Sequence, residues 1–108
     1  MTTVTKIIPG PCGFETTIEA KKVAPGHVYV KVISDCESLR KLNIGIVNAM
    51  EDLYGTFEKS KVYNRANECI RHIACPVPSA ILKTVEVEAD LAVPKDVKIE
   101  IVKTEEED

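Results

Sequence analysis

Apolar and polar residues alternate with a period of two in three segments of the first third of the chain. These segments are residues 3–8, 14–23 and 27–33, and in the last of them every second residue is valine. This period is typical of β-strands with one buried face. The segments are separated by Pro9-Gly10-Pro11 and by Pro25-Gly26, which disfavour regular structure and favour turns. The pattern therefore predicts a three-stranded antiparallel meander.

The spacing of apolar residues changes to three and four after Ser34. Ser34 and Glu37 also have the spacing of a capping box, which predicts Ser34 as the N-cap of a helix. Asn43 and Gly45 interrupt the pattern, so it predicts either one helix over residues 34–53 or two short ones. The predicted buried face of this region consists of Leu39, Leu42, Ile46, Ala49, Met50 and Leu53.

The second half of the chain predicts two further helices and a strand. Residues 55–66 are polar and mixed, which indicates a loop, and a short helix is predicted over residues 66–72. A longer helix begins at Cys75-Pro76, because proline is tolerated in a first turn, and it ends before Pro94. Residues 97–103 alternate again and predict a fourth strand. The predicted fold is α+β, with two or three helices packed on one face of the sheet between the meander and the fourth strand.

Length and composition indicate a single globular domain over residues 1–103, followed by an acidic tail at residues 104–108. The chain has 108 residues, of which 44% are apolar and 29% are charged. Its apolar runs are too short for a membrane span, and its net charge of −3 argues against nucleic-acid binding. No signal peptide is recognisable, which predicts a cytoplasmic protein. An exposed edge of the meander would allow a homodimer, and no other protein partner is identifiable.

The candidate chemistry lies in the four cysteines: Cys12, Cys36, Cys69 and Cys75. In a reducing compartment an even number of cysteines indicates metal or redox chemistry before disulfides. Cys12 falls in the bend between the first two strands, Cys36 where the third strand gives way to a helix, and Cys75 at the start of the last helix. In an antiparallel meander the first two positions lie at the same end of the sheet. We therefore expect the sulfurs to converge there.

Two kinds of metal site would suit four thiolates, namely zinc and an iron–sulfur cluster, and the sequence does not choose between them. Helix N-termini would stabilise the thiolates, and Gly13 lets the backbone approach a bound group closely. His72, three residues from both Cys69 and Cys75, is an alternative to Cys69 as a ligand. No acid–base pair or Ser-His-Asp arrangement is recognisable. We therefore expect a binding or accessory role and not a self-contained enzyme.

The order of these motifs resembles the TSCPD domain family, small cysteine-bearing domains found alone or at the end of cobalamin-dependent ribonucleotide reductases. The resemblance rests on Cys12-Gly13, on Cys36 after a strand, on Cys69 followed by Cys75-Pro76, and on the helix at residues 79–83. The chain also looks like short uncharacterised proteins of anaerobes. Asp35 departs from the family pattern, which tends to have glycine at this position. The resemblance implies a metal site of four cysteines, Cys12, Cys36, Cys69 and Cys75, without a specific reaction.

Two alternatives remain open at this point. Cys75-Pro76-Val77-Pro78 is similar to the Cys-Pro-x-Pro motif of TusA/SirA-like sulfur carriers, which implies a reactive thiol at Cys75 for sulfur transfer or thiol redox chemistry. In that family, however, the motif lies on the first helix, whereas here it follows three strands and a helix. The second alternative is a structural interaction domain whose cysteines hold no ligand, since free cysteine often packs as a small apolar residue.

Overall fold

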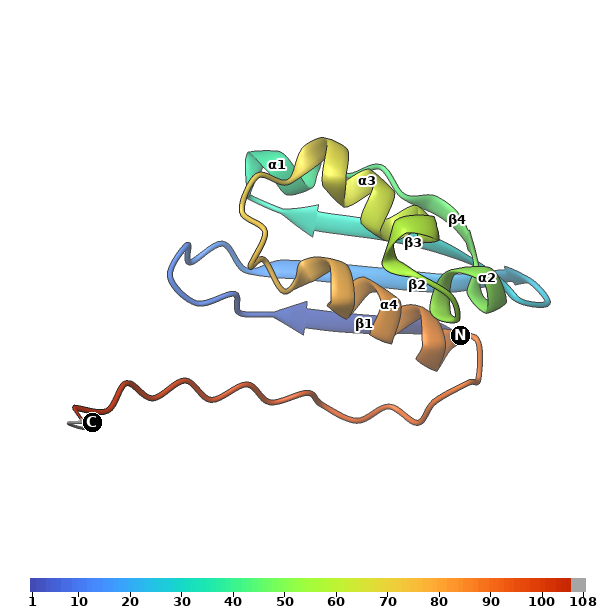
Figure 1. The fold of residues 1–108 in the computed structure, drawn as a ribbon. Coiled ribbons are helices and arrows are strands. Elements are labelled where there is room, and N and C mark those ends of the chain that lie inside the picture. Colours follow the sequence, from blue (N-terminus) through green and yellow to red (C-terminus); the bar gives the residue numbers. More distant parts are fainter. Residues whose placement is uncertain (106–108) are drawn as a thin grey trace.

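The computed structural model describes residues 1–105 and shows a four-stranded antiparallel sheet with helices on one face (Figure 1). The fold is therefore α+β, as predicted. The strands follow one another in space as in sequence: β1 (Thr2–Ile7), β2 (Thr16–Ala24), β3 (His27–Ser34) and β4 (Gly45–Asn48). The helices are α1 (Glu37–Arg40), α2 (Ala49–Leu53), the 3-10 helix η1 (Phe57–Lys59), α3 (Lys61–Cys69) and α4 (Val77–Glu88).

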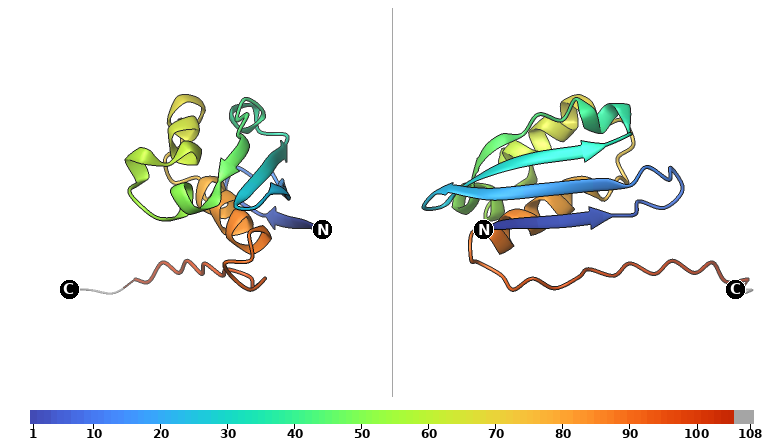
Figure 2. Two further views of the ribbon diagram at one scale, coloured as in Figure 1. Left: turned by 90° about the vertical axis from the view of Figure 1, so that its right-hand side faces the viewer. Right: turned by 180° about the vertical axis from the view of Figure 1, so that it is seen from behind.

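The alternation of β2 and β3 separates a buried face of the sheet from an exposed one. Ile18, Ala20, Val28 and Val30 are buried beneath the helices, whereas Tyr29 points to the opposite, exposed face. Seen end-on, the helices all lie to one side of the sheet (Figure 2). The period of two therefore predicted correctly which residues of these strands enter the core.

Helix α4 is the main helix over the sheet. Its stripe of Val77, Ile81 and Val85 is fully buried, and side-chain hydrogen bonds join the helix to the first two strands. The Thr84 hydroxyl is hydrogen bonded to the Thr5 hydroxyl of β1 at 2.7 Å. The Glu88 carboxylate accepts hydrogen bonds from the Thr3 hydroxyl at 2.7 Å and from the backbone N–H of Lys22 at 2.9 Å. These contacts determine how α4 lies on the sheet.

The prediction for residues 34–53 is wrong in two respects. The region contains two short helices, α1 and α2, but between them the chain forms β4, which pairs antiparallel with β3. The N-cap of α1 is Cys36 and not Ser34, whose side chain accepts a hydrogen bond from the Cys36 N–H before the helix begins. The sheet is therefore a four-stranded meander, with its fourth strand after α1.

Helix α3 begins earlier than the helix predicted over residues 66–72. The Ser60 hydroxyl accepts from the Tyr63 N–H, as expected of an N-cap. The carboxylate of Asp52, at the end of α2, accepts from the Lys61 N–H at 2.6 Å and from the Val62 N–H at 3.3 Å. The start of α3 therefore depends on a residue of the preceding helix, which sequence spacing does not reveal.

The predicted fourth strand at residues 97–103 is also wrong. This segment is extended and runs from a groove beside β1 and α4 past the end of β1, but it belongs to no ladder within residues 1–105 (Figure 1). Of the predicted acidic tail, residues 106–108 lie outside the described part of the chain. The longest helix between residues 1 and 105 has 12 residues, and none of the helices there could cross a membrane.

Candidate functional site

The register of the sheet brings three cysteine-bearing segments to one end of the molecule. Ile7, Thr16 and Ser34 are aligned across β1, β2 and β3, so the loop at residues 8–15 and the exit from β3 leave the sheet at the same end. The connection between α3 and α4, residues 70–76, also lies there (Figure 1). The expected gathering of the cysteine segments at a common end therefore agrees with the backbone arrangement.

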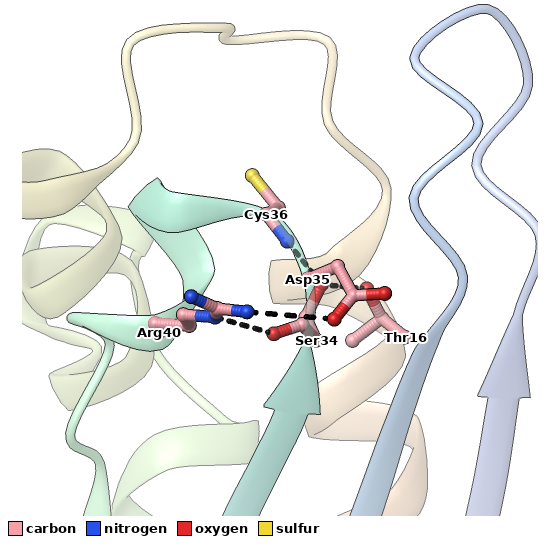
Figure 3. A network of polar contacts seen from close by, with 5 residues as sticks. All are labelled: Thr16, Ser34, Asp35, Cys36 and Arg40. Carbon is pink, nitrogen blue, oxygen red and sulfur yellow. Dashed lines mark hydrogen bonds and ion pairs between the residues drawn. The ribbon is translucent and has the colours of Figure 1, made fainter.

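Cys36 is held at this end by hydrogen bonds around the last residue of β3. Its backbone N–H donates to the Ser34 hydroxyl at 3.1 Å, and that hydroxyl is hydrogen bonded to the Thr16 hydroxyl at 2.9 Å. The Arg40 side chain donates through Nε to the Ser34 carbonyl at 3.1 Å and pairs with Asp35 at 3.4 Å. The partly buried Cys36 sulfur points away from this network (Figure 3).

This network is the part of the site that the sequence did not reveal. The sequence predicts Ser34 only as a helix cap, and the spacing of Arg40 from Ser34 matches no motif. A hydroxyl on β2 and one on β3 become neighbours only once the two strands are in register. The effect of the network is to fix the backbone from which the Cys36 side chain projects.

Cys12 lies in the exposed loop between β1 and β2. The loop contains a turn in which the Gly13 N–H donates to the Gly10 carbonyl at 3.0 Å. Gly10 and Gly13 have φ angles of +92° and +71°, which glycine adopts without strain. Nothing lies within 4 Å of the position that a Cβ on either glycine would occupy, so the loop is not packed against other parts of the chain at these points.

Cys75 is partly buried immediately before α4, and its N–H donates to the His72 carbonyl at 3.0 Å. Burial raises the pKa of the Cys75 thiol, since it disfavours the charged thiolate. A hydrogen bond from the Val77 N–H opposes this, and negative charge on Cys12 and Cys36 raises the pKa further. The Cys75 sulfur is therefore within electrostatic range of both other sulfurs, and its pKa is raised overall.

Cys69, the last residue of α3, is partly buried and directed elsewhere. Its thiol donates a hydrogen bond of 3.4 Å to the carbonyl of Lys41, the C-cap of α1. His72, the alternative ligand, has an exposed side chain. His27, the other histidine, lies at the opposite end of the sheet, where its Nδ1 is 3.0 Å from the Pro25 carbonyl.

All four cysteines are free thiols. Within residues 1–105 there is no group of three or more histidine, cysteine, aspartate or glutamate side chains with the spacing that a metal ion requires. The chain thus places Cys12, Cys36 and Cys75 in one neighbourhood without bringing them to ligand distance of a common point. Cys69 lies at the C-terminal end of α3, where its thiol faces the end of α1.

A family model described as a family of unknown function (DUF6951) matches residues 3–101, which include all four cysteines. No curated protein and no solved structure matches the chain.

Proposed function

The chain belongs to the DUF6951 family, whose function is unknown, and we propose that it is a metal-binding accessory domain. The ligands are the thiolates of Cys12, Cys36 and Cys75, with Cys69 as the fourth. The observation that carries this proposal is that three separate segments, which bear Cys12, Cys36 and Cys75, meet at one end of the sheet (Figure 1), where negative charge on Cys12 and Cys36 acts on the Cys75 thiol.

Electrostatics give the reason that a cation suits this place. Burial raises the pKa of the Cys75 thiol, and negative charge on Cys12 or Cys36 raises it further. A soft divalent cation reverses the sign of this effect, because thiolates are the ligands that zinc and iron–sulfur clusters prefer. The raised pKa favours the protonated Cys75 thiol in the metal-free protein, whereas a bound metal would favour its thiolate.

Two connections would have to shift to bring the ligands together. Cys12 is on a glycine-containing loop that packs against nothing at Gly10 or Gly13, and Cys75 is on the connection between α3 and α4. Cys36, by contrast, is fixed by the Ser34 network. We infer that Cys36 is the fixed point of the site. Cys12 and Cys75 would approach it, and Cys69 would exchange its hydrogen bond with the Lys41 carbonyl for the metal.

The role that follows is structural or accessory. When bound, a metal with four thiolates has a closed coordination shell, so it supplies cross-linking of the three segments rather than an open position for substrate. In the loaded protein, the 8–15 loop, the start of α1 and the start of α4 would be held together through their cysteines. The resemblance of the cysteine motifs to the TSCPD family supports the same proposal.

Metal content measured on protein purified without oxygen tests the proposal. We expect one zinc per chain with no colour, or iron and sulfide with visible absorbance. Replacing Cys12, Cys36 or Cys75 by serine should abolish loading, and Cys69→Ser should weaken it. Ser79→Ala, at the exposed start of α4, is the matched control and should load normally. Metal-free protein that binds no added zinc or iron, or full loading in all four cysteine variants, would contradict the proposal.

The reactive-thiol alternative at Cys75 predicts the opposite reactivity. A sulfur carrier needs a thiolate at neutral pH, whereas burial and the neighbouring sulfurs raise the pKa of Cys75. We therefore expect iodoacetamide to alkylate the exposed Cys12 faster than Cys75 at pH 7 in the metal-free protein, as peptide mass mapping would show. Alkylation of Cys75 ahead of Cys12 would favour sulfur transfer or thiol redox chemistry instead.

The remaining alternative, an interaction domain with unliganded cysteines, separates from the metal site through stability. If the metal cross-links three segments, adding it should raise the melting temperature. An interaction domain would melt at the same temperature with or without metal.

A further inference from the structure

Residues 94–103, which we call the C-terminal arm, form an extended segment with one apolar face. Val97, Ile99 and Ile101 alternate with Asp96, Lys98 and Glu100. The three apolar side chains are 58%, 71% and 90% exposed. This is the pattern of a strand that covers a core on one side, yet the arm pairs with no strand within residues 1–105.

The chain also offers an open sheet edge. β1 is one of the two edge strands, and within the described part of the chain no strand pairs with its outer side. Its N–H and C=O groups on that side are available for a further ladder. Next to this edge, a groove of about 840 Å³ lies between β1, α4 and the first residues of the arm itself, with Ile7, Ile8, Ala80 and Val87 among the residues that line it. An added strand would cover this groove with its apolar face.

The arm of the same chain does not fill this groove completely. Arm residues line the groove only as far as Ile99. Figures 1 and 2 show the rest of the arm continuing past the end of β1 and beyond the body of the molecule. Ile101 and Val102, 90% and 80% exposed, therefore lie where the described part of their own chain does not cover them.

The direction of the arm gives a second reason. The arm returns from the end of α4 and runs parallel to β1 (Figure 1), whereas every strand pair in the sheet is antiparallel. A fifth strand from the same chain would form a parallel pair, which is slightly less stable for each residue. An arm from another molecule is not constrained by the α4 connection and can pair in the antiparallel direction.

We propose that the C-terminal arm of one copy of this chain adds as a strand to the open edge of β1 in a second copy, giving a homodimer with exchanged arms. The exchange extends each sheet from four strands to five. It places the apolar side of the arm over the groove beside α4 and its charged side on the solvent-facing surface. It also removes the open edge of each copy.

Ile101→Lys tests the proposal, because Ile101 is too exposed for the change to disturb the fold of a single chain. In sedimentation equilibrium of the full chain under reducing conditions, we expect a dimer. Ile101→Lys should weaken dimerisation at least about a hundredfold, because each dimer with exchanged arms buries two copies of Ile101. Ile73→Lys is the matched control, since Ile73 is 96% exposed and lies outside the arm, and it should dimerise normally.

Isotope-filtered NMR of a mixture of labelled and unlabelled chains identifies the partner of the arm. We expect contacts between the arm of one chain and β1 of the other. The proposal is overturned by a monomer at all concentrations, by a dimer that survives Ile101→Lys unchanged, or by arm contacts to β1 of the same chain alone.

Discussion

Glu88 is the residue whose replacement most directly tests how α4 is fixed on the sheet. Glu88 as a whole residue is 8% exposed, and its carboxylate accepts two hydrogen bonds, one from β1 and one from the backbone of β2. Burial alone would raise the pKa of Glu88. The hydrogen bonds from Thr3 and Lys22, together with the positive charges of the α-amino group and Lys22, outweigh it and hold the pKa below its ordinary value of 4.5.

The size of the effect follows from these contacts. A hydrogen bond to a charged group contributes about 1.5–3 kcal/mol. Glu88→Gln retains a neutral acceptor but loses the charge and one good bond, so the free energy of unfolding should fall by about 1.5 kcal/mol. That corresponds to roughly 6 °C in melting temperature for a domain of this size. Glu88→Ala removes both acceptors and should cost about 3 kcal/mol, since it leaves two donors without their partner.

The pH dependence separates this explanation from a simple packing effect. A carboxyl group with a lowered pKa in the folded state stabilises the protein above its ordinary pKa, and this contribution is lost as pH falls through the lowered value. Wild type and Glu88→Gln should therefore differ at pH 7 and converge at acid pH, once the pH is below the lowered pKa of Glu88 and the carboxyl is protonated in both states. Urea titration followed by circular dichroism at both pH values measures the difference.

Glu68→Gln is the matched control. Glu68 pairs with Arg65 at 2.7 Å, but its side chain is 60% exposed, and such surface pairs contribute at most about 1 kcal/mol. The reasoning is refuted if Glu88→Gln is as stable as wild type at pH 7. It is equally refuted if the difference between them remains the same at low pH.

Three further outcomes are expected. Ile81→Ala should lower the free energy of unfolding by about 2–5 kcal/mol in urea titration, because Ile81 is fully buried between α4 and the sheet; a loss below 1 kcal/mol would contradict its place in the core. Asp52→Ala should lower the free energy of unfolding by about 1–2 kcal/mol in the same assay. It should also increase amide exchange at the start of α3, because the Asp52 carboxylate accepts hydrogen bonds from the first N–H groups of that helix. Ser34→Ala should weaken zinc binding about tenfold by freeing the backbone of Cys36, measured by competition with a chelator, and unchanged affinity would exclude the Ser34 network from the site.

The sequence by itself determined the strands and helices whose apolar pattern matches a single period. The alternation at residues 27–33 predicts both β3 and its buried face, and the spacing of Ile81 and Val85 predicts the buried stripe of α4. In these elements the local pattern and the tertiary environment favour the same structure, so the pattern is sufficient.

Elements that depend on a distant partner were not determined in this way. Residues 45–48 carry a helix-like spacing but form β4, because the edge of β3 is available to pair with them. Residues 97–103 have the alternation of a strand but no ladder within residues 1–105, since a strand exists only where a neighbour supplies hydrogen bonds. Local propensity cannot report the presence or absence of that neighbour.

The cysteines show the same division. Their positions at the ends of strands and helices were readable from the sequence, as was the expectation that Cys12 and Cys36 share one end of the sheet. The tertiary structure decided that Cys75 lies near both and that Cys69 faces the Lys41 carbonyl of α1. Distances between segments far apart in the chain depend on how helices pack and where loops turn, and the spacing of residues along the chain does not encode them locally.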